Sequence, residues 1–213
     1  MPIHQRVAQA LLEIDAVKFD PDNPIRFKSG ILSPVYVDNR SFPYYPPQWR
    51  IIIDGLCKSI EESNIEYDLI AGVALGGVPH AAALAHAAGK PMVIIRKETK
   101  EYGTQKLIEG GDVTAKRVLL IEDMITTGSS SLFAVNVLRQ SGAVVADLLA
   151  IVSYGFDEAA QAFAAAHVRA HTLTNFAAIL AVVAEQERFD ESQRRIIEDW
   201  LRDPRGWENK RDG

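Results

Sequence analysis

Short apolar runs that alternate with helical patterns constrain the fold of this chain most strongly. The runs have the length and aliphatic composition of buried strands, at 68–73, 91–95, 118–121 and 143–153. Helical spacing follows three of them, over 78–88, 130–139 and 158–166. Buried strands joined by helices are typical of a parallel sheet. The sequence therefore predicts an α/β fold with a doubly wound, mostly parallel sheet flanked by helices, which binds ligands beyond the carboxyl ends of its strands.

The remaining segments predict shorter elements at both ends of the chain. Apolar spacing indicates helices over 3–16 and 49–60, and a loop carrying Pro43, Pro46 and Pro47 precedes the second of them. Residues 25–38 read as short strands broken at turns. Two further helices are expected over 176–185 and 191–201. We expect one domain over 1–213, with residues 1–45 forming a small hood.

Composition narrows the class of protein. The 213 residues are 47% hydrophobic and carry a net charge of −5, which gives no electrostatic case for binding nucleic acid or a membrane surface. Cys57 is the single cysteine, so an internal disulfide and a cysteine-rich zinc site are excluded. The five histidines show no metal-ligand spacing. No signal peptide or membrane span is evident, so we expect a cytoplasmic protein.

The segment 117–131, RVLLIEDMITTGSSS, carries the clearest functional signal. An apolar run delivers Glu122 and Asp123 to the end of a strand, and a loop of small residues then leads into a helix. Free backbone N–H groups and partial positive charge at a helix N-terminus attract an anion, and the hydroxyls of Thr126 and Thr127 add donors. Carboxylates can accept hydrogen bonds from paired hydroxyls. These features suit a sugar phosphate, whereas an ordinary capped strand-turn-helix is the alternative.

This segment resembles the phosphoribosyl diphosphate (PRPP) signature of the type I phosphoribosyltransferases. The resemblance implies that Glu122 and Asp123 bind the ribose hydroxyls and stabilise positive charge on the sugar. It assigns the other PRPP contacts to the rest of the signature, namely Met124, Ile125, Thr126, Thr127, Gly128, Ser129 and Ser130.

A second glycine-containing loop, Ala74-Leu75-Gly76-Gly77, joins a strand to a helix. Its glycines would let backbone N–H groups face an anion, although a tight turn alone would also explain them. The resemblance makes it the pyrophosphate loop, which often contains a cis peptide bond, here between Ala74 and Leu75. Many relatives carry lysine where this chain has Gly76, so we expect pyrophosphate to be held there mainly by backbone.

Cations follow the strand at 91–95. Arg96, Lys97 and Lys100 suit a diphosphate leaving group, while the glutamates among them fit a solvated surface loop. The stretch Arg96–Lys106 resembles the mobile loop of orotate phosphoribosyltransferases, which reaches into the neighbouring subunit. That likeness makes Arg96, Lys97, Lys100 and Tyr102 PRPP-binding residues, with Lys100 catalytic. Tyr102 stands where relatives often have histidine, so imidazole proton transfer is not expected.

The run Lys28–Asp38 points to the base. Lys28, the backbone of 29–30 and Tyr36 supply a cation, amide donors and an aromatic wall, as a pyrimidine carboxylate requires; an edge hairpin with a solvated lysine is the alternative. The run resembles the orotate-specific segment, which implies orotate contacts at Lys28, Tyr36, Val37 and Thr126. Arg40 completes the orotate-specific pattern, although it could equally be a surface or subunit-interface residue. After the strand at 143–153 this chain has Ser153-Tyr154-Gly155-Phe156, where some relatives place a base-contacting arginine.

Together these segments make the chain resemble an orotate phosphoribosyltransferase, over nearly its whole length. The resemblance implies transfer of ribose 5-phosphate from PRPP to orotate, giving orotidine 5′-monophosphate and pyrophosphate in pyrimidine synthesis. It also implies Mg²⁺ held mainly by PRPP, no direct protein ligand for the metal, and a homodimer with shared active sites. Three alternatives remain: a purine or uracil transferase, a PRPP-binding regulator without catalysis, and a diphosphokinase.

Overall fold

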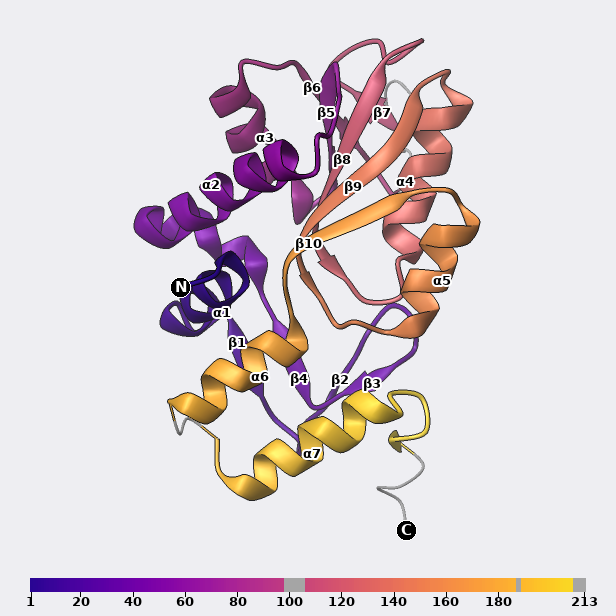
Figure 1. The fold of residues 1–213 in the computed structure, drawn as a ribbon. Helices are drawn as coiled ribbons and strands as arrows, with labels where there is room; N and C mark the ends of the chain where they lie inside the picture. Colours follow the sequence, from indigo (N-terminus) through magenta and orange to yellow (C-terminus); the bar gives the residue numbers. More distant parts are fainter. Residues whose placement is uncertain (98–105, 187–188, 209–213) are drawn as a thin grey trace.

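A six-stranded sheet forms the centre of the computed structural model, which describes residues 1–97, 106–186 and 189–208 (Figure 1). The strands, in spatial order, are β10 (Arg169–Asn175), β9 (Val144–Ser153), β8 (Arg117–Ile125), β5 (Leu69–Val73), β6 (Met92–Ile95) and β7 (Ile108–Glu109). Neighbours from β10 to β6 pair parallel, and β7 pairs antiparallel with β6. The predicted doubly wound, mostly parallel sheet is confirmed.

Helices cover both faces of this sheet (Figure 1). One face carries α2 (Pro46–Glu62) and α3 (Gly77–Ala88), while α4 (Ser129–Gln140) and α5 (Asp157–Ala165) cover the other. Successive side chains of a strand point to opposite faces, so Leu119 and Ile121 belong to the first core and Val118 and Leu120 to the second. Burial on both faces explains why the central strands read as continuous apolar runs.

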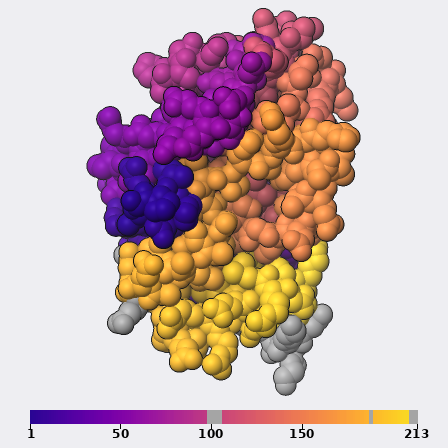
Figure 2. All heavy atoms as spheres, viewed as in Figure 1, coloured from indigo at the N-terminus to yellow at the C-terminus, as the bar shows by residue number. Residues whose placement is uncertain are grey.

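The two ends of the chain fold together below the carboxyl ends of the strands (Figure 1). The N-terminal part contains α1 (Ile3–Glu13), β1 (Val17–Phe19), β2 (Ile25–Arg26), β3 (Leu32–Ser33), β4 (Val35–Val37) and the 3₁₀ helix η1 (Asn39–Tyr44). The C-terminal part contains α6 (Phe176–Glu185) and α7 (Glu191–Arg202). Figure 2 shows α1 seated against the later segments of the chain, and α1 contacts α6 and β10.

The structure differs from the sequence prediction at several element boundaries. Pro46 and Pro47 begin α2 rather than ending a loop, because the first helical turn needs no N–H from these positions. The helix predicted over 3–16 ends at Glu13. Strand β8 continues four residues past the predicted end, to Ile125, because its pairing with β9 extends to Ser153.

Three short or polar strands escaped the sequence analysis. β10 lies at the edge of the sheet, and four of its seven residues are exposed, so it lacks the continuous apolar run of a central strand. β1 and β7 contain only three and two residues. Within the described ranges, no helix combines the length and apolar character needed to span a bilayer.

Candidate functional site

A cavity of about 660 Å³ opens where the loops after β5 and β8 diverge. From β5 the chain proceeds through α3 to β6 on one side, and from β8 it proceeds through α4 to β9 on the other. Such a reversal of strand order leaves a crevice at the carboxyl edge of the sheet. The predicted site residues that line the cavity are Lys28, Tyr36, Val37, Leu75, Gly76, Lys97, Glu122, Asp123, Met124, Thr126, Thr127, Gly128, Ser129 and Ser130.

The two acids of β8 lie in different environments. Glu122 is only 2% exposed, and its Oε2 accepts hydrogen bonds from the hydroxyls of Ser130 and Ser131 at 3.1 and 3.3 Å. Burial, followed by the negative charge of Asp123, raises the pKa of Glu122 well above its ordinary value. Asp123 is half-buried, and its carboxylate lies against Gly76. The site therefore holds one acid that is costly to ionise beside one that is open to the cavity.

The loop after β8 leads directly into the N-terminus of α4. Gly128 takes the left-handed conformation (φ 79°) directly before α4, and a Cβ at this position would meet the ring of Phe163 at 2.9 Å. The hydroxyls of Thr127 and Ser129 lie 2.9 Å apart. N–H groups in the first turn of α4 have no helical acceptor, and they carry the positive end of the helix dipole. The loop can therefore bind a phosphate group.

The loop after β5 has the predicted peptide geometry. The Ala74–Leu75 bond is cis, as the resemblance implied. Leu75 is exposed and lines the cavity together with Gly76. A Cβ on Gly76 would stand 2.0 Å from Oδ2 of Asp123, so the acid fills the space that a side chain at position 76 would need.

Several predicted residues lie outside this cavity lining. Arg96 Nη1 is 3.2 Å from Oε1 of Glu109, and Ile125 is buried at 2% exposure and faces away from the cavity. Ala74 and Gly77 flank the lining residues of their loop without joining them. Lys100 and Tyr102 fall outside the described residues, so their roles stay predictions.

The opposite end of the cavity is formed by the N-terminal strands. Lys28 is exposed there, and Tyr36 is half-buried. Arg40 Nη2 donates to the Tyr36 hydroxyl at 2.8 Å and to Asp38 Oδ2 at 2.9 Å, which fixes the ring and the guanidinium together. This hydrogen bonding and the charge of Asp38 raise the pKa of Arg40. The structure thus places Arg40 at the cavity, where the sequence had left its location open.

Sequence reasoning missed other lining residues. Tyr154 follows β9, is 5% exposed and lines the cavity. Its ring lies 5.3 Å from Phe27 and 5.4 Å from Trp200, measured between ring centroids. Phe133 on α4 is 39% exposed at the cavity wall. No sequence pattern marks these aromatic residues as part of the cavity, because the residues around them come from distant segments of the chain.

Two buried polar residues, Asn39 and His80, lie near Asp123. Asn39 in η1 is 1% exposed, and its Nδ2 donates to the Asp123 carbonyl at 2.9 Å. His80 in α3 is fully buried, and its Nδ1 accepts from Trp49 Nε1 at 3.0 Å. Burial lowers the pKa of His80 to about 4, so the ring is neutral at pH 7. His80 therefore has a structural role, because its hydrogen bond joins α2 to α3.

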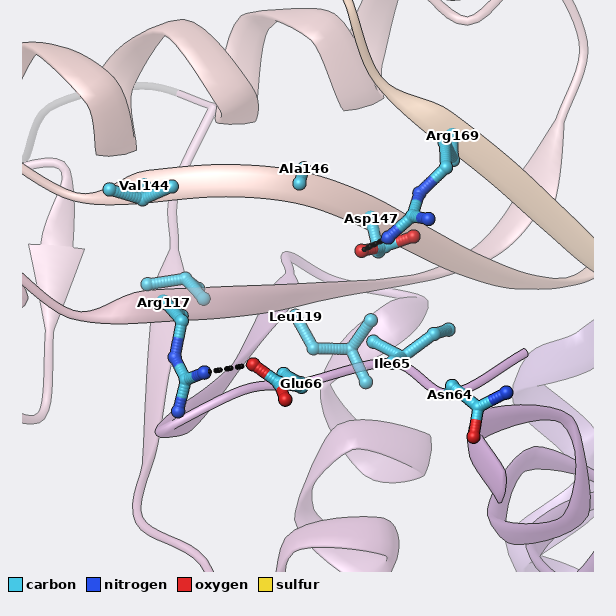
Figure 3. A pocket seen from close by; sticks show the side chains of 10 residues that line it. Asn64, Ile65, Glu66, Arg117, Leu119, Val144, Ala146, Asp147 and Arg169 are labelled. Atoms are coloured by element: carbon cyan, nitrogen blue, oxygen red, sulfur yellow. Dashed lines mark hydrogen bonds and ion pairs between the residues drawn. The ribbon is translucent and has the colours of Figure 1, made fainter. Parts of the chain in front are cut away.

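A second, smaller cavity of about 290 Å³ lies at the amino ends of β8, β9 and β10 (Figure 3). Its two arginines are already paired, Arg117 with Glu66 and Arg169 with Asp147 at 2.8 Å. In open α/β sheets ligands bind at the carboxyl ends of the strands instead. The larger cavity is therefore the candidate active site.

The described residues contain no group of three or more His, Cys, Asp or Glu side chains that could hold a metal ion. Among the residues that the structure describes, Glu122 and Asp123 are the acids that line the cavity, and a divalent cation there would need oxygen ligands from a bound phosphate and from water. This donor set would fit magnesium carried by a diphosphate.

Comparisons with known proteins agree with this geometry. The profile of the phosphoribosyl transferase domain matches residues 44–168. The chain is 37% identical over 202 residues to orotate phosphoribosyltransferase of Coxiella burnetii, which covers 95% of this chain and 97% of the relative. It is 39% identical over 194 residues to the Staphylococcus saprophyticus protein of the same name, covering 91% and 96%.

Solved structures with this fold carry related names. The crystal structure of orotate phosphoribosyltransferase from Aeropyrum pernix superposes with a TM-score of 0.74 at 28% identity, covering 86% of this chain and 99% of that one. UMP synthase of Leishmania donovani gives 0.80 at 25% identity, covering 92% of this chain, which spans 42% of that longer protein. This chain belongs to the phosphoribosyltransferase family, and within it to the orotate phosphoribosyltransferases.

Proposed function

We propose that this chain transfers the ribose 5-phosphate group of PRPP to orotate, releasing pyrophosphate and forming orotidine 5′-monophosphate. One observation carries this assignment. A single cavity combines the phosphate loop before α4, the acids of β8 and the Lys28–Tyr36 base segment. The relatives named above share the activity in their names over nearly the full length of both chains.

In this proposal the 5′-phosphate binds the N–H groups and hydroxyls of residues 126–130, and Asp123 accepts hydrogen bonds from the ribose hydroxyls. The bond between the anomeric carbon and the pyrophosphate oxygen breaks as the orotate ring nitrogen attacks, through an oxocarbenium-like state comparable to that of glycoside cleavage. Because the ring nitrogen can attack as an anion, no strong general base is required. The catalytic roles of Glu122, Asp123 and Lys100 are electrostatic.

The buried carboxyl of Glu122 gives this electrostatic role a physical basis. Its pKa is raised because burial and Asp123 both disfavour its charge. Positive charge that develops on the bound sugar would favour the ionised form, so the interaction strengthens as the transition state forms. Lys97, which lines the cavity, and Arg96 and Lys100 are proposed to neutralise the departing pyrophosphate.

Magnesium would enter this site on PRPP, held by diphosphate and ribose oxygens and by water. When bound, it would neutralise charge on the leaving group, and Asp123 is the acid of β8 that is open to the cavity. We further propose a cytoplasmic homodimer, in which the stretch Arg96–Lys106 completes the partner's site. Residues 1–45 are proposed to act as a hood over the base within one domain.

At the base end, Lys28 is proposed to meet the exocyclic carboxylate and Tyr36 to pack against the ring, with Val37 and Thr126 beside it. All four line the cavity. A purine or uracil lacks the carboxylate that Lys28 would pair with. This difference favours orotate over those bases as the substrate. A regulator without catalysis would keep the phosphate loop but would not need this carboxylate site.

The test is incubation of the protein with PRPP, magnesium and orotate, while the loss of orotate absorbance is followed. We expect turnover that requires all three components and that Asp123→Asn reduces severely without unfolding the protein. Uracil and adenine in place of orotate are matched controls and should give no product. Turnover of one of these bases alone would support a different transferase, and PRPP binding without turnover of any base would support a regulator.

A further inference from the structure

The C-terminal helix contacts the strands that form the base end of the cavity. Trp200 of α7 is fully buried, and its Nε1 donates to the Leu32 carbonyl of β3 at 2.8 Å. Its ring also stands edge-on to Phe27, with the ring centroids 6.4 Å apart. The hydrogen bond joins residues that are 168 positions apart in the sequence, so folding of α7 is coupled to the position of the N-terminal strands.

A second connection lies just beyond α7. Glu208 accepts a hydrogen bond from Nη1 of Arg26 at 3.0 Å, and the same nitrogen donates to the Gly30 carbonyl at 2.9 Å. Arg26 therefore ties the C-terminal segment to the turn that contains Lys28. Arg26, Phe27 and Lys28 all line the cavity, whereas Trp200 and Glu208 do not.

The strands that carry this turn are weakly held on their own. β2 and β3 contain two residues each and form a separate two-stranded sheet that is not paired with the central one. Within the turn, Gly30 N–H donates to Phe27 O and Phe27 N–H donates to Ile31 O, each at 2.9 Å. These bonds close the turn but do not place it relative to the sheet, and an isolated two-stranded hairpin is marginally stable in water.

We propose that residues 191–208 are a positioning element of the base site, in which Trp200 and Glu208 hold the turn at 26–30 where Lys28 meets the orotate carboxylate. This inference rests on the proposed function. Both residues act through the turn and touch no substrate, so they are positioning residues rather than catalytic ones.

The expected effect on the kinetic constants depends on the fraction of molecules in which the turn at 26–30 holds its binding-competent conformation. When a binding-competent arrangement is only partly populated, apparent affinity falls by that fraction. Among the described contacts, neither the Trp200 nor the Glu208 hydrogen bond goes to the loop before α4 or to the acids of β8. Weakening the contacts of Trp200 and Glu208 with the turn at 26–30 should therefore raise the KM for orotate and leave the KM for PRPP and kcat nearly unchanged.

The experiment compares variants of the two positioning residues, Trp200 and Glu208, with a matched control. Trp200→Phe keeps an aromatic ring but removes the N–H donor, and Glu208→Gln removes the charge paired with Arg26. Asp199→Asn is the control, because it breaks an exposed pair with Arg202 within α7 and leaves the turn untouched. We expect Trp200→Phe to raise the KM for orotate about three- to tenfold, the range of one lost hydrogen bond. Glu208→Gln keeps an acceptor and removes the charge of an exposed pair, so we expect it to raise this KM about two- to fivefold. The KM for PRPP should change less than about twofold, and the control should match wild type.

Amide hydrogen exchange of the protein without substrates provides a readout that does not depend on activity. Trp200→Phe should speed exchange over residues 27–33 and leave residues 126–131 unchanged. Unaltered KM for orotate in both variants, or parallel loss for both substrates, would reject the positioning role. If Trp200→Phe does not fold, Glu208→Gln decides the kinetic question alone. If wild type does not turn over orotate, the proposed function fails, and the exchange measurement alone judges whether α7 holds the turn.

Discussion

Gly76 lies so close to Asp123 that no side chain fits at this position without moving the acid. A Cβ on Gly76 would stand 2.0 Å from Oδ2 of Asp123, while the backbone of Gly76 is ordinary right-handed helical (φ −63°, ψ −39°). Its neighbour Gly77 is enclosed differently, because a Cβ there would stand 2.5 Å from the Ile121 carbonyl. One glycine makes room for a side-chain carboxylate, and the other makes room for the backbone of a strand.

This contrast predicts different outcomes for two similar substitutions. Gly76→Ala should fold normally but lower kcat at least about tenfold, because Asp123 must rotate away from the sugar and lose a charge-assisted contact. Gly77→Ala should instead destabilise the fold by about 1–3 kcal/mol, because the backbone of β8 cannot yield. Urea unfolding and turnover of both variants check this. Wild-type turnover in a folded Gly76→Ala protein would contradict the role given to Asp123.

Glu122 predicts an unusual pH dependence of stability. Its pKa is raised by burial, so the folded state prefers the protonated form, and wild-type stability falls as pH rises from the ordinary value of 4.5 toward the raised one. Gln at this position keeps the shape and does not titrate. The free energy of unfolding of Glu122→Gln minus that of wild type should therefore increase between pH 4.5 and pH 8 in urea titrations of the substrate-free protein. Parallel pH profiles would argue that the Glu122 carboxyl is as easily ionised as in water.

At the scale of elements, the helices and strands around the cavity hold its polar groups from behind. α3 packs against β5 and β8, and its buried His80 accepts the Trp49 hydrogen bond that joins α2 to α3. Asn39 joins η1 to the carbonyl of Asp123 on β8. These contacts come from separate elements, so the site is a product of their packing rather than of one loop.

His80 predicts loss of stability in acid. Burial holds the pKa of His80 at about 4, whereas in the unfolded chain it is 6.5. The nearby charge of Asp123 opposes this shift and does not cancel it. The stabilisation is present above pH 6.5 and is lost as pH falls toward 4, with a full effect of about 3 kcal/mol.

Urea unfolding of wild type and His80→Gln, measured at pH 7 and at pH 4.5, checks this expectation. Gln offers an acceptor for the Trp49 indole but takes up no proton. Wild type should lose more stability than the variant over this interval. Equal losses would indicate that other groups cause the acid sensitivity.

The accuracy of the sequence prediction also varied by element. Central strands and amphipathic helices were placed within a few residues, because burial on one or both faces imposes a regular pattern on the chain. β10 was missed because most of its residues are exposed at the edge of the sheet, so it has no apolar run. The end of β8 was missed because its length depends on pairing with β9, which no local pattern records.

At the scale of the whole molecule, the stretch Arg96–Lys106 and the described cavity belong together in the proposed dimer. Mixing Lys100→Ala with Asp123→Asn should restore activity, because a hybrid dimer has one site with an intact acid and an intact loop from the other subunit. With random exchange, half of the dimers are hybrids and each has one competent site, so about one quarter of wild-type activity is expected. Each variant alone is the control. No recovery after demonstrated subunit exchange would reject a shared site.

The sequence by itself determined the fold class, the small-residue loop before α4 and the paired acids, because each leaves a local pattern in the chain, whereas the position of the cis peptide came from the family resemblance. Only the tertiary structure decided that Glu122 is buried against Ser130 and Ser131, that Arg40 and Tyr154 reach the cavity, and that α7 braces the base end. The physical reason is separation along the chain. Local motifs fix backbone geometry within a few residues, whereas burial and hydrogen bonding across 168 positions exist only once the core has packed.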